Sequence, residues 1–549
     1  MAKPWLSKWP RYVPKTIEYP EFSLGEVLER SAKEAPDKTA IYYHDASLTF
    51  KELDGLATKF AEALLSLDIK KNDRVAIYLP NFPQFVVAYY GALRAGSIVV
   101  AISTLYKERE LETILVDSGA KVIVAWNQLY PYVQSIRGRT KLEHVIVTEG
   151  SVLAPNDLTS YKDVKSKSCP GALNMELLLA RHEEHLEPAK VEPKKDLALL
   201  QYTGGTTGTP KGAMLTHHNL VVNAAQFATW LQMRPGQDVH LSTLPFFHIY
   251  GMTTAMNVPI YTWSPMILIP DARDINAILQ AITKYEPTVF CGVPGMYIAL
   301  INQPDIGRHN LRSIQVCVSG ATALPVEVQR KFETLTGGRL VEGYGLTEAS
   351  PVTHVNPLDD RSKNRVGSIG IPISDTDAKI VDLETGEQDL PPQTPGELVV
   401  RGPQIMVGYW NSPSESNAVL RGEWLHTGDI ATMDPDGYFR IVDRKSDMIN
   451  ISGLKVWPRE VEEVLYEHPA VREATVIPVP DPVSGEAVKA FVILKDEYKG
   501  KISADEISIF CKGKIASYKA PRIVEFRDSL PKTSVGKILR RELRGKPTA

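Results

Sequence analysis

The segment QYTGGTTGTPKG, from Gln201 to Gly212, combines residue types that can hold phosphate groups. It contains four glycines, four threonines and one lysine directly after the apolar run LALL. Glycines let a backbone turn so that several N–H groups point in one direction, threonine hydroxyls add donors, and Lys211 adds a positive charge. The alternative is an ordinary Gly/Thr-rich surface loop. We favour a cradle for phosphate oxygens because the segment follows an apolar run typical of a buried strand.

The order of residues in this segment excludes the standard Walker phosphate loop. That loop requires Gly-Lys-Ser/Thr at the start of a helix. Here Lys211 precedes Gly212, and no hydroxyl residue follows the lysine. The chain therefore binds phosphates in another way, and a ligand for magnesium has to come from elsewhere in the sequence.

A second candidate segment, VEGYGLTEASP, runs from Val341 to Pro351. Tyr344 lies between two glycines, which leaves its ring face open to a flat partner such as adenine. Thr347 offers a hydroxyl, and Glu348 offers the hard oxygen ligand that Mg²⁺ prefers. Taken alone, the segment is equally compatible with a hairpin-like turn that carries a solvated glutamate.

Two more segments carry charged residues at turns. In HTGDIATMDPDGYFRIVDRKSDMINISG, Asp429 follows a glycine and can accept two ribose hydroxyls, while Arg444 can reach the same sugar or a phosphate. In LPKTSVGKILRRELR, Lys537 follows a glycine, a position that presents a lysine instead of burying it. The alternatives are charged residues on a solvated sheet edge and a solvated basic tail.

The elements that must position these residues alternate between strands and helices in the first half of the chain. Such alternation predicts largely parallel sheets covered by helices. The strands are expected at 74–80, 97–102, 120–126, 287–294 and 314–320, and the helices at 82–96, 107–119 and from Pro325 onward. Gly96 and Gly119 are expected to end the first two of these helices.

The pattern changes twice in the second half. Short strands at 396–402, 422–434 and 437–444, with a tight turn at Asp434–Gly437, predict a β-rich subdomain. A helix at 457–469 that begins with Pro458, strands at 473–481 and 486–495, and a helix at 504–515 then predict an independent α+β domain.

The predicted fold class is α/β. We expect a large N-terminal domain, 1–442, made of two αβ-layered subdomains and the β-rich subdomain, then a linker at 443–446. A small mobile α+β domain, 447–549, follows the linker.

Composition excludes several classes of protein. A chain of 549 residues exceeds the size of a single core, which stops growing at about 250–300 residues. The net charge of −3 gives no bias toward nucleic acid.

The four cysteines form no CxxC pair, which predicts reduced, buried thiols in a cytosolic protein. No signal peptide and no membrane-spanning helix is expected, so we expect a cytoplasmic protein. Peripheral contact with a membrane and a homodimer are left open.

Together these segments resemble the adenylate-forming superfamily of acyl-CoA synthetases, adenylation domains and luciferases. YTGGTTGTPKG, GYGLTE, TGD, DRKSDMI and PKTSVGK occur in that order and spacing, and the resemblance runs from about Phe22 to about Leu543. Within the superfamily, KPWLSKWPRYVP, PFFHIYGM and SGLKVWPREVEE look most like bacterial and archaeal long-chain fatty-acid–CoA ligases. The resemblance implies that the chain activates a fatty acid with ATP and Mg²⁺ to an acyl-adenylate, releases pyrophosphate, and transfers the acyl group to CoA.

The resemblance also implies roles for individual residues. The phosphates of ATP would be bound by Thr203, Gly204, Gly205, Thr206, Thr207, Gly208 and Lys211. The adenine would be bound by Gly320, Ala321, Thr322, Glu342, Gly343, Tyr344 and Gly345, and the ribose by Asp429 and Arg444. Lys537, Thr347, Glu348 and Lys211 would be catalytic, with Lys537 bridging the carboxylate and the α-phosphate and Glu348 binding Mg²⁺. The acyl and CoA side would be formed by His248, Tyr250, Met252, Ser452 and Gly453.

Two positions depart from the pattern of the family. The hinge position carries Ser446, where relatives usually have aspartate or lysine, and a small polar residue can still absorb a backbone rotation. Met252 stands where some long-chain relatives have a tryptophan, so a tunnel gated by that tryptophan is not implied.

Three alternative functions stay open or are disfavoured. A CoA ligase for a medium-chain, aryl or hydroxy acid is the main alternative, because one methylene changes binding by only about 1 kcal/mol and chain length cannot be read from a sequence. An amino-acid-activating domain is disfavoured, since no aspartate lies between His248 and Met252. A non-catalytic nucleotide sensor would be expected to lack Lys537, Glu348 or Asp429, and all three are present.

Overall fold

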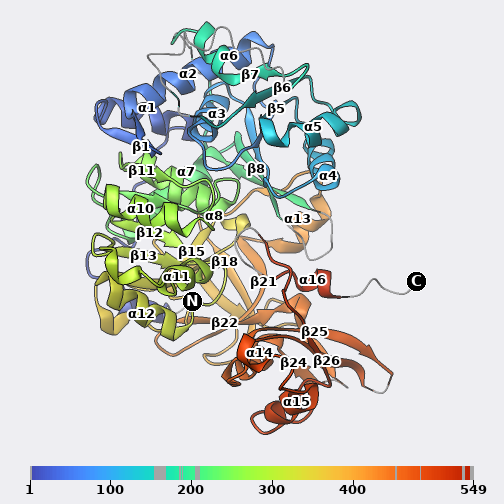
Figure 1. Ribbon diagram of the computed structural model, residues 1–549. Coiled ribbons are helices and arrows are strands. Elements are labelled where there is room, and N and C mark those ends of the chain that lie inside the picture. The colour runs from blue at the N-terminus through green and yellow to red at the C-terminus, as the bar shows by residue number, and fades with distance from the viewer. Residues whose placement is uncertain are drawn as a thin grey trace. The chain divides into compact units, whose positions relative to one another are not determined.

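The computed structural model describes residues 3–151, 153, 169–184, 187, 189–203, 210–451, 454–482, 484–533 and 538–544 (Figure 1). The chain divides into two compact units. The larger unit contains Trp5–Asp377 and Arg401–Leu425, and the smaller contains Met1–Pro4, Ala378–Val400 and His426–Ala549.

One sheet of the larger unit has eight strands among the described residues, in the order β19-β9-β8-β4-β3-β5-β6-β7. The strands from β8 to β7 are parallel to one another, whereas β9 is antiparallel to both β8 and β19. Their bounds are β3 Arg74–Tyr78, β4 Ile98–Ala101, β5 Val122–Trp126, β6 His144–Thr148, β7 Leu173–Asn174, β8 Leu197–Thr203, β9 Lys211–Thr216 and β19 Gly408–Tyr409.

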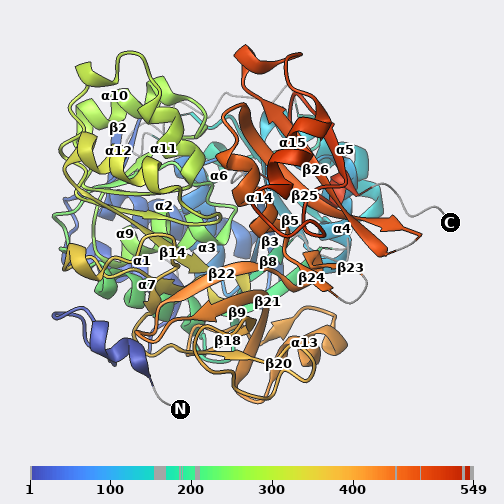
Figure 2. The same ribbon diagram turned by 90° about the horizontal axis from the view of Figure 1, so that it is seen from below.

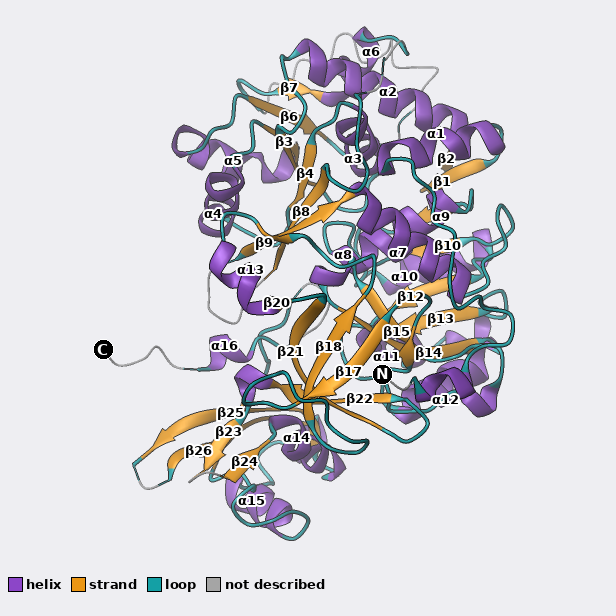
Figure 3. Ribbon diagram, turned by 180° about the vertical axis from the view of Figure 1, so that it is seen from behind, coloured by secondary structure: helices purple, strands orange, loops and turns teal. Residues whose placement is uncertain are grey.

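Helices cover both faces of this sheet. Figure 3 shows α4 (Glu108–Ser118) and α5 (Tyr130–Ile136) on one side and α3 (Pro83–Arg94) on the other. Every residue of α3 is buried, which explains why its sequence is apolar all round. Gly119 ends α4 in the left-handed conformation, with φ of 60°, as the sequence predicted.

A second sheet of the larger unit has nine strands among the described segments, in the order β16-β15-β14-β13-β12-β10-β11-β1-β2. It is parallel from β14 to β1 and antiparallel at both ends. The bounds are β1 Thr39–Tyr43, β2 Ala46–Thr49, β10 His240–Ser242, β11 Met266–Leu268, β12 Val289–Gly292, β13 Val316–Ser319, β14 Arg339–Gly345, β15 Val352–Val355 and β16 Ile371–Pro372.

Capping boxes begin two of the other helices that the structure describes in the larger unit. Ser23 with Glu26 and Thr49 with Glu52 form capping boxes at the starts of α1 and α2. The bounds are α1 Leu24–Glu34, α2 Phe50–Ser66, α6 Met175–Arg181, α7 His217–Trp230, α8 Ile249–Met252, α9 Val258–Tyr261, α10 Ile275–Tyr285, α11 Pro294–Ile301, α12 Val326–Thr336, α13 Pro413–Val419 and β20 Leu420–Arg421.

The smaller unit contains the predicted β-rich part. Its strands are β17 (Asp377–Val381), β18 (Gly396–Arg401), β21 (Trp424–Met433) and β22 (Phe439–Arg444), and β21 pairs with both β18 and β22. The predicted turn joins β21 to β22, where the N–H of Gly437 donates to the carbonyl of Asp434 at 2.9 Å.

An antiparallel sheet and two main helices follow in the same unit. The sheet has the order β24-β23-β26-β25, with β27 parallel to β26, and Figure 2 shows α14 and α15 beside it. Val461, Val464 and Leu465 of α14 are buried, as their spacing predicted. The bounds are β23 Ile449–Ile451, β24 Leu454–Val456, β25 Val471–Asp481, β26 Gly485–Leu494, β27 Ile523–Phe526, α14 Pro458–Glu467, α15 Ala504–Lys512 and α16 Arg540–Leu543.

The predicted α/β fold class, with its layered, β-rich and α+β parts, is confirmed. The linker predicted at 443–446 lies within the smaller unit, across the end of β22 and the 3-10 helix Lys445–Asp447, and its role as a domain boundary stays a prediction. Each of the four cysteines is buried, and no disulfide joins any of them. In the part of the chain that the structure describes, no helix has the length and apolar character needed to cross a membrane.

Candidate functional site

The predicted phosphate segment is carried by a β-hairpin of the larger unit. Thr203 ends β8, Lys211 begins β9, and the two residues are direct partners across the antiparallel pair. Gly204, Gly205, Thr206, Thr207 and Gly208 lie outside the described residues, so the cradle itself stays a prediction. The hairpin nevertheless fixes the two ends of this segment, because Thr203 and Lys211 lie on neighbouring strands.

Lys211 is paired with a carboxylate that the sequence did not indicate. Its Nζ lies 2.5 Å from Oε1 of Glu415, in α13. The same Nζ lies 5.6 Å from the ring centroid of Tyr409, in β19, which pairs with β9. The lysine side chain is 19% exposed, so its charge is partly shielded from water and gains from a partner.

The two glycines beside Tyr344 serve close packing. Tyr344 lies on β14 opposite His354 of β15, not in a turn. A Cβ added to Gly343 would lie 2.9 Å from Cγ1 of Val318, and one added to Gly345 would lie 2.2 Å from the carbonyl oxygen of Pro351. Each glycine therefore has a packing reason of its own, and the binding of adenine against the Tyr344 ring stays a prediction.

Glu348 follows β14 in the short 3-10 helix Thr347–Ala349 and is tied to the segment around Tyr409. The hydroxyl of Tyr409 donates to Oε1 of Glu348 at 2.6 Å, and the N–H of Met406 donates to the backbone oxygen of Glu348 at 2.8 Å. The structure thus brings the predicted residues Lys211 and Glu348 to one tyrosine, Lys211 near its ring and Glu348 at its hydroxyl. Sequence reasoning missed Tyr409, which carries no motif signal of its own.

The carboxylate of Glu348 fits a magnesium ion whose other ligands come from a nucleotide. Among the residues described, no cluster of three or more His, Cys, Asp or Glu side chains is arranged to hold a metal. Mg²⁺ is commonly bound by one or two carboxylates together with substrate phosphates. Because Tyr409 takes up only Oε1 of Glu348, the second carboxylate oxygen can serve as such a ligand.

The predicted adenine loop and the predicted acyl-side residues are close neighbours. Gly320, Ala321 and Thr322 follow β13; Gly320 is buried, whereas Ala321 and Thr322 are exposed. A Cβ on Gly320 would lie 3.0 Å from Cε1 of Tyr250, so this tyrosine packs directly against the loop. The Tyr250 hydroxyl donates to the carbonyl of Val318 at 2.8 Å, and burial raises the pKa of Tyr250 well above its ordinary value.

The remaining acyl-side residues differ in their surroundings. His248 precedes α8 and accepts the backbone N–H of Tyr250 on Nδ1 at 3.2 Å, which caps the helix. Met252 is fully buried. Ser452 and Gly453 lie outside the described residues, so their predicted position at the CoA side stays a prediction.

In the smaller unit, the two residues predicted at the ribose face each other. Asp429 and Arg444 are direct partners on β21 and β22, and Nε of Arg444 lies 3.2 Å from Oδ1 of Asp429. Asp429 is 5% exposed, whereas the Arg444 side chain is 40% exposed. The hairpin therefore holds a buried acceptor beside a cation that reaches solvent.

A buried glutamate that the sequence analysis missed lies beside the same hairpin. Glu397 of β18 is 4% exposed, and its Oε2 lies 3.0 Å from Nζ of Lys445 and 3.4 Å from Nδ1 of His426. Burial by itself raises the pKa of Glu397, but His426 and Lys445 outweigh burial and bring this pKa down from 4.5 to about 2. Lys445 directly precedes Ser446, so this pair anchors one end of the predicted linker.

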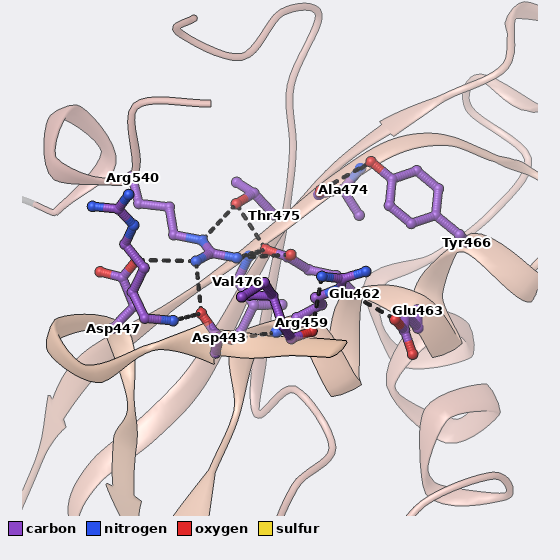
Figure 4. A network of polar contacts seen from close by, with 12 residues as sticks. Asp443, Asp447, Arg459, Glu462, Glu463, Tyr466, Ala474, Thr475, Val476 and Arg540 are labelled. Atoms are coloured by element: carbon purple, nitrogen blue, oxygen red, sulfur yellow. Dashed lines mark hydrogen bonds and ion pairs between the residues drawn. The ribbon is translucent and has the colours of Figure 1, made fainter. Parts of the chain in front are cut away.

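Arg540 of α16 joins three carboxylates on both sides of the predicted hinge (Figure 4). Its guanidinium lies 3.2 Å from Asp443, 3.0 Å from Asp447 and 2.8 Å from Glu462. Asp443 precedes Ser446 and Asp447 follows it, and Ser446 lies in the 3-10 helix Lys445–Asp447. Arg540 therefore cross-links the two ends of the linker.

Asp443 makes a second contact besides the one with Arg540. Its Oδ2 accepts the N–H of Arg459 at 2.7 Å, and so it caps the start of α14, whose own N-cap residue makes no side-chain bond. Burial raises the pKa of Asp443, and Arg540 and two backbone N–H groups only partly offset this. Burial lowers the pKa of Arg540, but Glu462, Asp443 and Asp447 outweigh it and hold this pKa above its ordinary value.

Comparisons with known proteins agree with this arrangement. A model of the AMP-binding enzyme family matches residues 28–410, and a model of the AMP-binding enzyme C-terminal domain matches 460–537. A long-chain-fatty-acid–CoA ligase of Bacillus subtilis is 45% identical over 98% of this chain and 97% of its own length. A protein of that name from Escherichia coli is 40% identical over 99% of this chain and 98% of its own.

Solved structures give the same result. The chain superposes on an anthranilate CoA ligase in complex with anthranoyl-AMP with a TM-score of 0.83 and 31% identity, covering 95% of this chain and 97% of that one. For a long-chain-fatty-acid–CoA ligase of Archaeoglobus fulgidus the TM-score is 0.70 and the identity 28%, covering 94% and 100% of the two chains.

Replacing Arg540 by methionine is expected to lower the free energy of unfolding by about 3 kcal/mol, because three partly buried carboxylates would lose their shared cation. Urea denaturation of the full chain measures this loss. Arg544→Met is the matched control: among the described residues Arg544 forms an ion pair only with Asp447, and its side chain is 35% exposed, so its loss should cost less than about 1 kcal/mol. Equal effects of the two substitutions would contradict the cross-link.

The lowered pKa of Glu397 predicts a dependence of stability on pH. A carboxyl whose pKa falls on folding stabilises the protein fully above its unfolded value of 4.5, and the contribution is lost as pH falls toward the folded value of about 2. The free energy by which wild type exceeds Glu397→Gln should therefore shrink by about 2 kcal/mol between pH 5 and pH 2. Urea unfolding at a series of pH values checks this, and a difference that stays constant with pH would contradict it.

Proposed function

This chain belongs to the AMP-binding enzyme family, and from that premise we propose that it activates a long-chain fatty acid with ATP and transfers the acyl group to CoA. One observation carries the proposal. The relatives named long-chain-fatty-acid–CoA ligases match 98% and 99% of this chain, so the match includes the candidate residues of both units. The paired charges around Lys211 and Glu348 support it, because they lie where ATP phosphates and a metal ion would be needed.

A free carboxylate is a poor acyl donor, so the acid has to be activated before the acyl group can be transferred. An oxygen of the fatty-acid carboxylate attacks the α-phosphorus of ATP, the bond to the β-phosphate oxygen breaks, and pyrophosphate leaves. The CoA thiolate then attacks the acyl carbon, and AMP leaves with the electron pair of the broken C–O bond. Both steps bring anions together, so positive charge has to be supplied by the protein.

Lys211 and Lys537 are assigned to supply that charge. Two unit charges about 4 Å apart at an effective dielectric constant near 20 interact by about 4 kcal/mol before desolvation. Lys211 forms an ion pair with Glu415, and we assign it as a cation for the phosphates of ATP. Thr347 would contact a phosphate, and Glu348 would hold Mg²⁺, which would supply charge neutralisation at the phosphates. Lys537 lies outside the described residues; we assign it to bridge the carboxylate and the α-phosphate.

The ribose and the hinge are assigned to the smaller unit. Asp429 accepts the ribose hydroxyls, and Arg444 assists from the neighbouring strand. Thioester formation requires a different approach to the acyl carbon, and we assign this to a rotation about Ser446 that removes Lys537. The contacts of Arg540 with Asp443 and Asp447 support this assignment, since they tie the segment after Lys537 to both sides of the hinge.

A second candidate function is a CoA ligase for an aryl acid. The specific observation in its favour is the close structural similarity to the anthranilate CoA ligase. The nature of the acid separates the two candidates, because the AMP-forming chemistry is the same in both.

We expect pyrophosphate release with ATP and Mg²⁺ to be greatest with long-chain acids and to turn over only when CoA is present. The measurement is pyrophosphate release across a panel of carboxylic acids from short to long chain, with aryl acids included. Activity restricted to aryl or short acids would move the assignment to the second candidate. Absence of release with every acid would overturn the proposed function.

Replacing Lys537 by alanine is expected to slow adenylate formation at least about 100-fold, the size of one transition-state contact in a shielded site. Transfer from a supplied acyl-adenylate to CoA should be much less affected, because that step runs with Lys537 removed. Lys532→Ala is a matched control on the same segment, since Lys532 forms an ion pair with Glu473 at 2.7 Å. Equal losses in the two half-reactions of Lys537→Ala would contradict the domain rotation.

A further inference from the structure

We propose that Tyr409 is a positioning residue for the metal site: its hydroxyl fixes Glu348 so that the free carboxylate oxygen faces the magnesium–nucleotide complex. The inference rests on the proposed function for the identity of the ligand. The contact itself joins two segments 61 residues apart, and nothing in the four motifs of the sequence indicates it.

The backbone around Tyr409 is fixed on three sides. Its N–H donates to Oγ of Ser416 at 2.8 Å, and the N–H of Trp410 donates to the carbonyl of Gly212 at 2.8 Å. Gly408 has φ of 146°, and a Cβ there would lie 3.1 Å from Oγ of Ser416. Tyr409 is 8% exposed. A side chain on so constrained a backbone has little freedom and can orient its partner.

The hydrogen bond from Tyr409 to Glu348 is of a strong kind. An O–H donor bonded to a carboxylate at 2.6 Å is charge-assisted, and such bonds are about twice as strong as neutral ones. The bond takes up Oε1 and leaves Oε2 without a hydrogen bond from any described residue. A carboxylate that is held by one oxygen can bind a metal through the other without first losing rotational freedom.

Tyr409 also connects Glu348 to the phosphate-side cation. Its ring lies 5.6 Å from Nζ of Lys211, within the range of a cation–π contact. The ring therefore sits between a residue assigned to the metal and one assigned to the phosphates. Tyr409→Phe keeps this ring contact and removes only the hydroxyl, which makes the substitution a clean probe of the bond to Glu348.

The chain offers a matched control for the loss of a tyrosine–carboxylate bond. Tyr19 donates to Oδ2 of Asp375, also at 2.6 Å and also within the larger unit. Neither residue has been assigned to substrate or metal. Tyr19→Phe therefore removes the same kind of hydrogen bond without touching Glu348, and it reports what such a loss does to the fold alone.

The experiment measures ATP binding by calorimetry, in the absence of any acid, with and without saturating Mg²⁺. In wild type, Mg²⁺ should tighten ATP binding. In Tyr409→Phe this gain should fall about tenfold, the value of one charge-assisted hydrogen bond, while affinity without Mg²⁺ stays unchanged. Tyr19→Phe should behave as wild type. The Mg²⁺ concentration for half-maximal pyrophosphate release should rise in parallel.

The double variant Tyr409→Phe/Glu348→Gln tests whether Tyr409 acts on magnesium binding through Glu348. If Tyr409 acts through Glu348, the hydroxyl has no further influence on the magnesium gain once the carboxylate is gone. A normal gain in Tyr409→Phe, together with a reduced gain in Glu348→Gln, would overturn the inference and leave the proposed function standing. A normal gain in Glu348→Gln would overturn the metal assignment and this inference with it. Absence of pyrophosphate release with every acid would instead count against the proposed function, since the binding measurement does not depend on turnover.

Discussion

A charge that is partly withdrawn from water needs a partner of opposite sign, and this requirement determines how the basic residues of both units are held. Lys211 is paired with Glu415, Arg444 with Asp429, and Lys445 with Glu397. In each pair at least one residue lies on a strand, and its partner lies on a strand or a helix, so the backbone sets the positions of the charges. These pairings therefore offset part of the cost of removing the charges from water.

This pairing has a consequence for binding a polyanion. Phosphates that bind Lys211 in the proposed way would compete with the carboxylate of Glu415 for the same cation. The ends of the predicted phosphate segment are held in place, because Thr203 and Lys211 are direct partners on β8 and β9.

Much of the fold could be predicted from the sequence because the signals are local. Gly119 ends a helix through its own backbone conformation, and the turn from Asp434 to Gly437 closes a hairpin through contacts within five residues. The candidate site was predictable only where a motif is contiguous. The bond between Tyr409 and Glu348 spans 61 residues and that between Arg540 and Asp443 spans 97, and no periodicity or spacing records such contacts. The glycines beside Tyr344 have packing contacts that the local pattern did not indicate, because these contacts come from Val318 and Pro351.

The contacts of Arg540 are not equivalent with respect to a rotation about Ser446. Asp447 and Glu462 follow the hinge in the chain, as Arg540 does, so they can move with the arginine. Asp443 precedes the hinge and belongs to β22, and it also caps α14 through the N–H of Arg459. The proposed rotation at Ser446 would therefore stretch the contacts of Asp443 while leaving the other two intact. Because Arg540 would keep two carboxylates, such a rotation would cost a fraction of the cluster's energy and not the whole of it.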